Sequence, residues 1–158
     1  MKTKGFTLIE VIIAIVLVGI AITSLVAGTR TFTKVAGAGA ELCTAEFLVE
    51  QIRELTTLLA VVDPNTGTST FGPEEAALAD YDDLDDFDGA VFSPPISADR
   101  TALNDLAAYS QQITVENLHP SDFGQVMADH GSNFVRVTVN VMLNSEQISS
   151  ANWIRADY

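Results

Sequence analysis

A single carboxylate, Glu10, lies at the start of a long apolar segment near the N-terminus. Residues 11–29 contain no charged side chain, and the next charge is Arg30. A lone charge buried in hydrocarbon costs about 2.5–3.5 kcal/mol on the mildest insertion scale, so an acid here needs a partner or a function. Glu10 is therefore the first candidate functional residue. The alternative is a glutamate that reaches toward the lipid headgroups without a partner.

A second acidic group lies in the middle of the chain and offers candidate calcium ligands: Asp82, Asp83, Asp85, Asp86 and Asp88. Calcium prefers carboxylate oxygens, but an EF-hand loop does not fit, because counting back from Gly89 as its sixth position puts Leu84 at the first ligand. An irregular calcium site is one interpretation. The favoured interpretation is a solvated acidic loop over residues 72–89, with Tyr81, Leu84 and Phe87 packed onto the core and no cofactor bound.

The remaining reactive residues do not indicate an enzyme. His119 and His130 lack metal-ligand spacing to another histidine or cysteine, and no phosphate-binding loop, dinucleotide fingerprint or nucleophile elbow is present. We expect both to be satisfied surface histidines. Cys43 is the single cysteine, so an intrachain disulfide is excluded. We expect it to be a small buried apolar residue on a helix.

The apolar segment has the length of a membrane span. Residues 11–29 would form a helix about 28 Å long, close to the roughly 30 Å of a bilayer core. A secretory signal peptide has an apolar region of only about 7–15 residues, which is shorter than this one. Basic residues lie on both sides (Lys2, Lys4, Arg30 and Lys34), and the short N-terminal tail favours a cytoplasmic N-terminus.

Beyond the apolar segment, the pattern predicts that the helix continues to about residue 60. One apolar stripe recurs at spacings of three and four and comprises Leu42, Ala45, Val49, Ile52, Leu55, Thr56 and Leu59. Charged residues occupy the opposite side. Gly37 and Gly39 disfavour helix by about 1 kcal/mol each relative to alanine, so we expect a bend there. The turn residues of segment 63–67 end the helix.

The C-terminal half predicts an antiparallel sheet. Segment 133–143 alternates strictly, with Val135, Val137, Val139 and Val141 on one face. Segment 111–117 is the expected partner strand, and the tail, residues 152–158, is expected to add a last strand that contains Trp153. Packing the valine face against the amphipathic helix gives an α+β fold of two layers.

Segment Lys4-Gly5-Phe6-Thr7-Leu8-Ile9-Glu10, followed by its apolar helix, resembles the processing signature of type IV pilins and type II secretion pseudopilins. The resemblance covers residues 4 to about 28. It implies that a prepilin peptidase cuts between Gly5 and Phe6 and N-methylates the new terminus. Many pilins close a C-terminal loop with a disulfide, which this chain lacks. The acidic loop more faintly resembles those of minor pilins of the mannose-sensitive haemagglutinin pilus.

The resemblance divides the chain into a leader (residues 1–5), an assembly helix (6–29), its amphipathic continuation (30–62) and a globular head (63–158). It implies a single-pass protein of the bacterial inner membrane, with a periplasmic head, that moves into a pilus fibre or a periplasmic pseudopilus. The implied partners are membrane lipid, the prepilin peptidase, the assembly machinery and other subunits. Some pseudopilins bind calcium in a loop, which keeps that alternative open here.

After cleavage, the amine of Phe6 would be a cation without a fixed partner. Pairing it with Glu10 of a neighbouring subunit would relieve both charges in hydrocarbon and fix the position of one subunit against the next. The whole chain carries a formal net charge of −13, and loss of Lys2 and Lys4 makes this −15, which disfavours direct nucleic-acid binding. The hypothesis is a minor pilin, with a pseudopilin as one alternative. A membrane protein with an acidic sensor or adhesin domain that never polymerises is the other.

Overall fold

The computed structural model describes residues 5–65 and 67–157. It divides into two compact units, which meet in the sequence between Ala40 and Glu41. Each unit is described by itself below. The element order is one long helix followed by five strands, with two short 3-10 turns between them.

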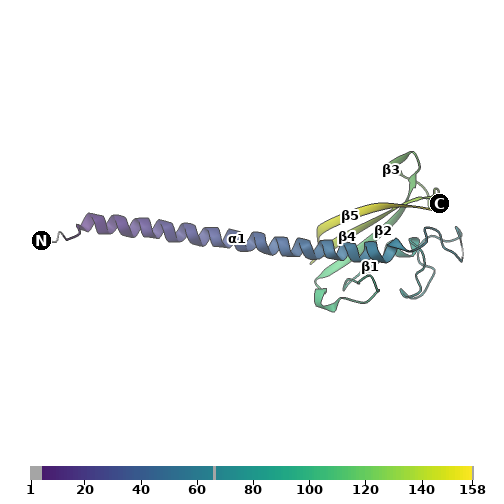
Figure 1. Cartoon of the computed structure of the whole chain (residues 1–158), viewed down its shortest axis with the longest axis horizontal. Coiled ribbons are helices and arrows are strands. Elements are labelled where there is room, and N and C mark those ends of the chain that lie inside the picture. Colours follow the sequence, from purple (N-terminus) through teal and green to yellow (C-terminus); the bar gives the residue numbers. More distant parts are fainter. Residues whose placement is uncertain (1–4, 66, 158) are drawn as a thin grey trace. The chain divides into compact units, whose positions relative to one another are not determined.

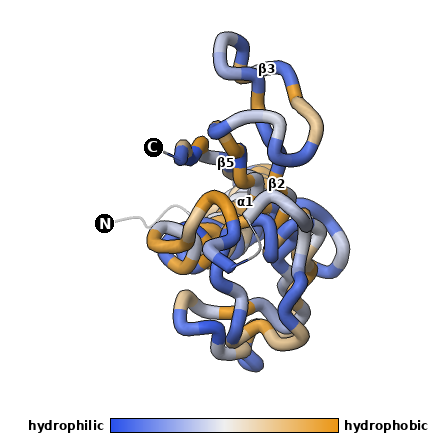
Figure 2. The backbone as a smooth tube through the Cα atoms, turned by 90° about the vertical axis from the view of Figure 1, so that its right-hand side faces the viewer, coloured by the Kyte–Doolittle hydropathy of each residue, from blue (hydrophilic) through white to orange (hydrophobic). Residues whose placement is uncertain are grey.

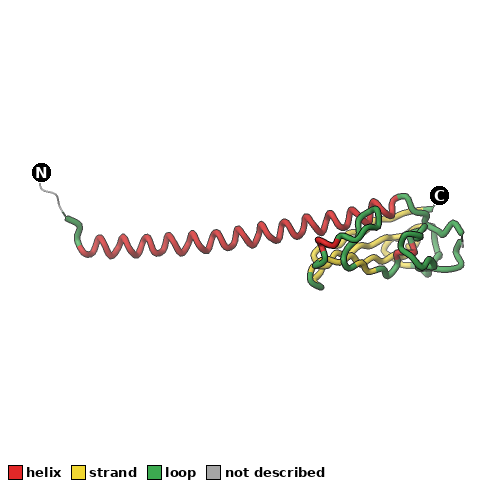
Figure 3. Tube along the Cα trace, turned by 90° about the horizontal axis from the view of Figure 1, so that it is seen from below, coloured by secondary structure: helices red, strands yellow, loops and turns green. Residues whose placement is uncertain are grey.

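The long N-terminal helix predicted from the sequence is confirmed. Helix α1 (Leu8–Thr57) is 50 residues long and belongs to both units (Figures 1 and 3). It begins two positions after Phe6 and ends at Thr57 rather than near residue 60. Gly37 and Gly39 are helical, so the glycines do not end the helix. The bend expected at these glycines stays a prediction.

In the first unit, the apolar side chains of α1 are exposed and do not form a hydrophobic core. Leu8 is 79% exposed, Ile15 66% and Leu25 69%. The hydroxyl groups of Thr23 and Ser24 turn back to the carbonyl of Ile20, at 2.9 and 2.8 Å, so they make hydrogen bonds without water. Among the described residues, α1 is the one helix long and apolar enough to cross a membrane. Exposed apolar side chains and internally bonded hydroxyl groups are compatible with a helix that contacts lipid or other protein chains.

In the second unit, five antiparallel strands form one sheet, as the sequence predicts for its C-terminal half. The strands are β1 (Val91–Phe92), β2 (Tyr109–His119), β3 (Asp122–Val126), β4 (Phe134–Leu143) and β5 (Glu146–Ala156). Their order is β1-β2-β4-β5, and β3 pairs only with the end of β2. Figure 2 shows β3 projecting away from the rest of the sheet. The sequence does not predict β1 or β3.

Strand β4 lies between β2 and β5 in the sheet and contributes several residues to the core. Its register places Val137 opposite Val115 on β2 and Trp153 on β5. The four valines predicted to share a face are all buried: Val135, Val137, Val139 and Val141. The alternation predicted from the sequence is therefore confirmed. The predicted last strand is also confirmed, although it begins at Glu146 and forms a hairpin with β4.

The helix face that packs on these valines differs from the predicted stripe at two positions. Ala45, Val49 and Ile52 are buried as expected, and Leu48 is buried although the stripe omits it. Leu42 is 48% exposed. Cys43 is also exposed, so the expectation of a buried cysteine is wrong. It precedes Ala45 by two positions, about 200° around the helix, and therefore faces away from the core.

Two polar side chains tie the layers together. Gln111 is fully buried, donates to the carbonyls of Leu48 (2.9 Å) and Ile96 (3.1 Å), and accepts from the amide of Ile96 at 2.8 Å. Arg155 donates to the carbonyls of Thr56 and Thr57, at 2.7 and 2.8 Å. Arg155 thus satisfies carbonyls left open at the C-terminal end of α1.

Candidate functional site

The first turn of α1 is closed by a reciprocal pair of hydrogen bonds. The backbone amide of Thr7 donates to Glu10 Oε2 at 2.8 Å, and the amide of Glu10 donates to Thr7 Oγ1 at 3.4 Å. The Thr7 hydroxyl also donates to Glu10 Oε2, at 2.7 Å. This is a capping box, in which the residue before the helix and its third residue satisfy each other's amides. Thr7 and Glu10 have the residue types and spacing of this motif, which is the sequence signal that predicts it.

The capping box places the Glu10 carboxylate at the helix N-terminus, where the macrodipole favours a negative charge. Oε2 accepts both bonds from Thr7, and Oε1 makes no hydrogen bond within the described part of the chain. All the atoms of the box lie beyond the Gly5–Phe6 bond, so cleavage at that bond would leave it intact. Glu10 therefore has a local partner and one carboxylate oxygen still available.

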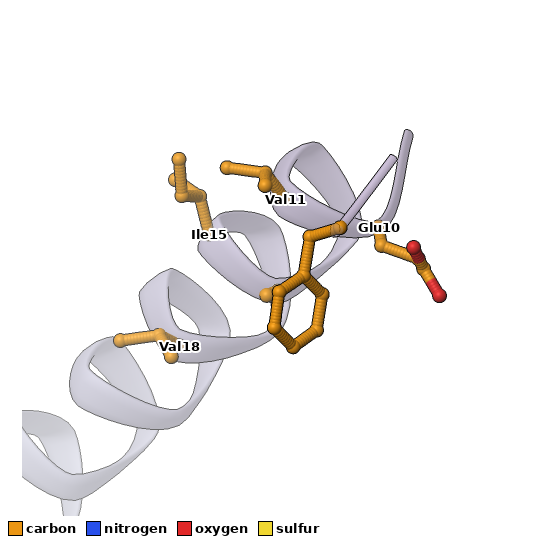
Figure 4. Close-up of a pocket in the computed structure, with 6 residues that line it drawn as sticks. Glu10, Val11, Ile15 and Val18 are labelled. Atoms are coloured by element: carbon orange, nitrogen blue, oxygen red, sulfur yellow. The ribbon is translucent and has the colours of Figure 1, made fainter. Parts of the chain in front are cut away.

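An apolar groove lies beside Glu10 on the same helix. Its lining consists of Phe6, Glu10, Val11, Ala14, Ile15 and Val18. Figure 4 shows Val11, Ile15 and Val18 along one side of the helix, with the Glu10 carboxylate projecting away from them. Spacings of three and four residues bring such side chains into one row. The helix thus presents an apolar strip, formed by Val11, Ile15 and Val18, and the Glu10 carboxylate near its start points to another side of the helix.

The predicted processing residues precede the helix. Gly5 and Phe6 are exposed and non-helical, and the Phe6 side chain is 87% exposed. A peptidase needs an accessible, extended peptide, which a helical segment does not offer. The positions of Gly5 and Phe6 are compatible with cleavage between them, which stays a prediction.

The acidic segment is not the solvated loop expected from the sequence. Asp83, Asp85 and Asp86 are 1%, 2% and 1% exposed, respectively. The expected anchoring is confirmed, since Leu84 and Phe87 are fully buried and Tyr81 packs edge-on against Phe87. Asp85–Phe87 forms a 3-10 turn. Burying these apolar side chains draws the aspartates between them into the unit as well.

The five aspartates have different roles in this turn. Asp86 Oδ2 accepts from the amides of Asp82 (2.8 Å) and Asp83 (3.3 Å), and Asp83 Oδ1 accepts from the amide of Asp86 at 3.1 Å. Asp85 accepts from the amide of Gly72. Asp88 Oδ1 accepts from the amide of Val115 on β2 at 2.8 Å, and its own amide donates to the carbonyl of Asp85.

Only part of the predicted calcium set comes together. One carboxylate oxygen from each of Glu75, Asp82 and Asp86 lies within 4.8 Å of the others. A second such group contains Asp63, Glu74 and Glu75. The sequence does not predict Asp63, Glu74 or Glu75 as members, because they lie outside the dense run of aspartates and only the fold brings them near.

Hydrogen bonds between carboxyl groups and burial raise the pKa of two of these acids. The hydrogen bond to Asp86, together with burial, raises the pKa of Glu75 to about 7. Burial and then the hydrogen bond to Asp85 raise the pKa of Asp83 to about 8. Both shifts favour the protonated acid near neutral pH. The cluster therefore keeps part of its carboxyl groups protonated near neutral pH.

His130 is not the exposed surface residue that the sequence suggests. Its side chain is 12% exposed and lies 3.9 Å from Asp85. Nε2 is 2.6 Å from the carbonyl of Thr70, and the ring packs edge-on against Phe71. His119 ends β2, where Nδ1 accepts from the amide of Ser121. His119 Nδ1 also lies 3.1 Å from the Ser121 hydroxyl at an exposed position, whereas His130 packs the segment before the acidic turn.

Comparison with protein families identifies one match. The prokaryotic N-terminal methylation motif matches residues 1–26. Comparisons with curated proteins and with solved structures return no match. The matched segment contains Gly5, Phe6 and Glu10 and most of the apolar segment, so the match coincides with the structural features of the first unit.

Proposed function

Because its first 26 residues carry the N-terminal methylation motif of type IV pilins and pseudopilins, we propose that this chain is a minor pilin. It would be a structural subunit that prepilin peptidase processes and that polymerises through α1. The motif supports the coarser pilin or pseudopilin role, and the family is structural rather than catalytic. The observation that carries the proposal is Glu10 at the start of an exposed apolar helix.

The geometry supports a pairing role for Glu10. Thr7 holds the carboxylate at the N-terminus of α1, while Oε1 makes no hydrogen bond within the described residues. Cleavage after Gly5 would create an ammonium group at Phe6. Pairing that ammonium with Glu10 of a neighbour would avoid two separate charges in an apolar surround. The stacked helices would then be held at one axial position.

In this proposal, the subunit waits in the inner membrane with its N-terminus in the cytoplasm and its head in the periplasm. The apolar strip that faces lipid before assembly would face other helices in the fibre. Its partners are other pilin subunits, the prepilin peptidase and the assembly machinery. Strong negative charge on the head disfavours direct contact with nucleic acid.

The test has two steps. Sequencing the mature N-terminus should give N-methylated Phe6, and a chain that still begins at Met1 would overturn the proposal. Sheared extracellular filaments should then contain the protein. Its retention in a periplasmic filament would indicate a pseudopilin, and its absence from any filament would indicate a membrane protein that does not polymerise.

A matched pair of variants separates assembly from helix capping. Glu10→Ala should be cleaved normally but enter filaments at least about tenfold less, because it leaves the neighbour's ammonium unpaired in an apolar surround. Thr7→Ala removes the capping hydroxyl and keeps the carboxylate, so it should be incorporated nearly normally. Equal incorporation of the two variants would contradict the pairing role.

A further inference from the structure

Two basic side chains follow the apolar segment of α1 in the first unit. Arg30 and Lys34 are exposed and four positions apart, so they lie on one side of the helix. Residues 11–40 contain no acid that could pair with them. In the described part of the chain, the ion pairs use other cations: Arg53, His130 and Arg136. Like charges at this spacing repel each other, so acids from another chain would stabilise this basic pair.

In the second unit, α1 carries two acids at the same spacing. Glu50 and Glu54 are exposed and four positions apart. The Glu54 side chain forms no hydrogen bond or ion pair with any other described residue. Glu50 pairs with Arg53 on the same helix at 3.1 Å, yet its side chain is still 58% exposed. These two acids also repel each other, so cations from another chain would stabilise them.

The basic pair and the acidic pair match in spacing. Each spans four positions of a helix, which is a rise of about 6 Å. Two parallel helices can therefore place Arg30 beside Glu50 and Lys34 beside Glu54 at the same time. Antiparallel helices would exchange these partners, but two copies anchored in one membrane run parallel. The charges thus define both the direction and the alignment of the contact.

We propose that Arg30 and Lys34 of one copy bind Glu50 and Glu54 of a second copy through parallel α1 helices. This inference rests on the proposed function, which supplies the shared membrane and the fibre. The partner is a second copy, because this chain carries both halves of the contact. The bases lie before residue 40 and the acids after it, so each copy can use both surfaces at once. Such a heterologous contact extends into an open array.

The side chains beside the charges fit the same alignment. In the first unit, Thr23 and Ala27 precede the basic pair on its side of the helix, and in the second unit Cys43 and Phe47 precede the acidic pair in the same way. The alignment places Ala27 beside Phe47, which is 49% exposed. A small residue opposite a large ring lets two helices approach closely. It also places Thr23 beside Cys43.

One other alignment has the same spacing, with Arg30 beside Glu46 and Lys34 beside Glu50. The Ser149 hydroxyl on β5 already donates to Glu46 Oε1 at 2.6 Å, which holds that carboxylate against the sheet. This alternative would also leave Glu54 unpaired. We therefore assign the contact to Glu50 and Glu54.

Charge reversal of the full chain, read out in sheared filaments, tests the pairing. Lys34→Glu and Glu54→Lys should each enter filaments at least about threefold less than the wild type, because each places like charges at the contact. The double variant restores opposite charges and should be incorporated at nearly the wild-type level. Normal incorporation of both single variants, or no rescue in the double variant, would overturn the pairing.

Two controls separate this contact from other effects. Asp105→Lys makes the same change of charge as Glu54→Lys, at an exposed acid on the 3-10 turn Asn104–Leu106, and should be incorporated normally. An equal loss in the two variants would overturn the assignment, because net charge alone would explain it. Cleavage after Gly5 should be normal in every variant. Wild-type protein that is cleaved but absent from filaments would contradict the proposed function itself, and the contact with it.

A disulfide cross-link tests the alignment without changing the charges. Cys43 is the single cysteine of the chain and is exposed, so Thr23→Cys adds one thiol for it to pair with. Oxidised filaments of this variant should contain covalent multimers of the chain, and adding Cys43→Ser should abolish them. Cross-linking through Ala27→Cys but not through Thr23→Cys would overturn this alignment in favour of Glu46. A cross-link to a different protein would contradict the assignment to a second copy.

Discussion

At the scale of single residues, buried polar side chains in this chain differ in which groups form their hydrogen bonds. Gln111 makes hydrogen bonds with both its amide nitrogen and its oxygen. Asp86 is 1% exposed, and its Oδ2 accepts from the amides of Asp82 and Asp83. Asp86 also hydrogen-bonds to the Glu75 carboxyl group, which raises the pKa of Glu75 to about 7. Gln111 is thus satisfied by backbone groups alone, whereas Asp86 depends in part on a neighbouring acid.

Gln111→Leu should lower the free energy of unfolding by about 1–3 kcal/mol, although the two side chains have similar volumes. The substitution leaves the amide of Ile96 buried without its acceptor, and the carbonyls of Leu48 and Ile96 lose a donor. Gln112→Leu, at the exposed neighbouring position, is the control and should change stability little. Chemical denaturation of both variants measures the difference. Equal midpoints would contradict a structural role for Gln111.

At the scale of elements, the end of α1 depends on a residue nearly a hundred positions away. Arg155 on β5 donates to the carbonyls of Thr56, Thr57 and Leu59. The last turn of α1 contains no basic residue of its own. A cation at this end therefore supplies both hydrogen bonds and a favourable interaction with the helix dipole.

Arg155→Met should destabilise the second unit by about 1–3 kcal/mol, because the variant keeps the length of the side chain but removes all its donors. Arg53→Met is the comparison. Arg53 is exposed, lies over the ring of Trp153 at 5.0 Å and pairs with Glu50, so its loss should cost less than about 1 kcal/mol. Thermal melting of both proteins in detergent tests the order. A larger loss in Arg53→Met would contradict the capping role.

The acidic turn also makes stability depend on pH. Asp83 titrates near pH 8 in the folded chain and near 3.8 when unfolded. The folded chain thus holds an extra proton between these values, so stability should fall as pH rises from about 4 to about 8. Asp85 and Asp86 are the acids that act on Asp83, and His130 near Asp85 is the nearby base. Melting curves in chelator measure the trend.

Asp83→Asn should make the decline with pH shallower, because the position no longer loses a proton. A Tm that is constant between pH 5 and 8 in the wild type would contradict the raised pKa values. The sign is opposite to that of an ordinary salt-bridged aspartate, whose stabilising effect increases with pH.

The elements show what sequence periodicity can and cannot establish. The alternation in β4 is predictable because the two-residue period of the side chains coincides with alternating burial from Phe134 to Met142. The burial of Asp83 and Asp85 could not be predicted in this way. A run of aspartates is typical of a solvent-exposed loop, but the neighbouring Leu84 and Phe87 pack into the core and bring the backbone of the aspartates with them. Glu75 was missed for a different reason. Its proximity to Asp86 depends on the path of the intervening loop, which no periodic pattern describes.

At the scale of the whole molecule, the two units differ in how they bury apolar surface. The core residues of the second unit, from Ala45 to Val141, all lie beyond Ala40. The first unit keeps its large apolar side chains exposed. Its segment has four of the eight basic residues, while Glu10 is its only acid among the 21 in the chain. Most of the negative charge is thus on the unit that has its own core.

A fragment that begins at Glu41 should therefore be soluble without detergent and unfold cooperatively. Its hydrophobic core is complete, and its strong negative charge opposes association. We expect a Tm within about 5 °C of the full chain in detergent, since the lost residues contribute no buried core. A fragment that begins at Val49 is the matched control: it lacks Ala45 and Leu48, which are fully buried, and should unfold at a much lower temperature. Aggregation or non-cooperative melting of the longer fragment would show that the second unit needs the first in order to fold.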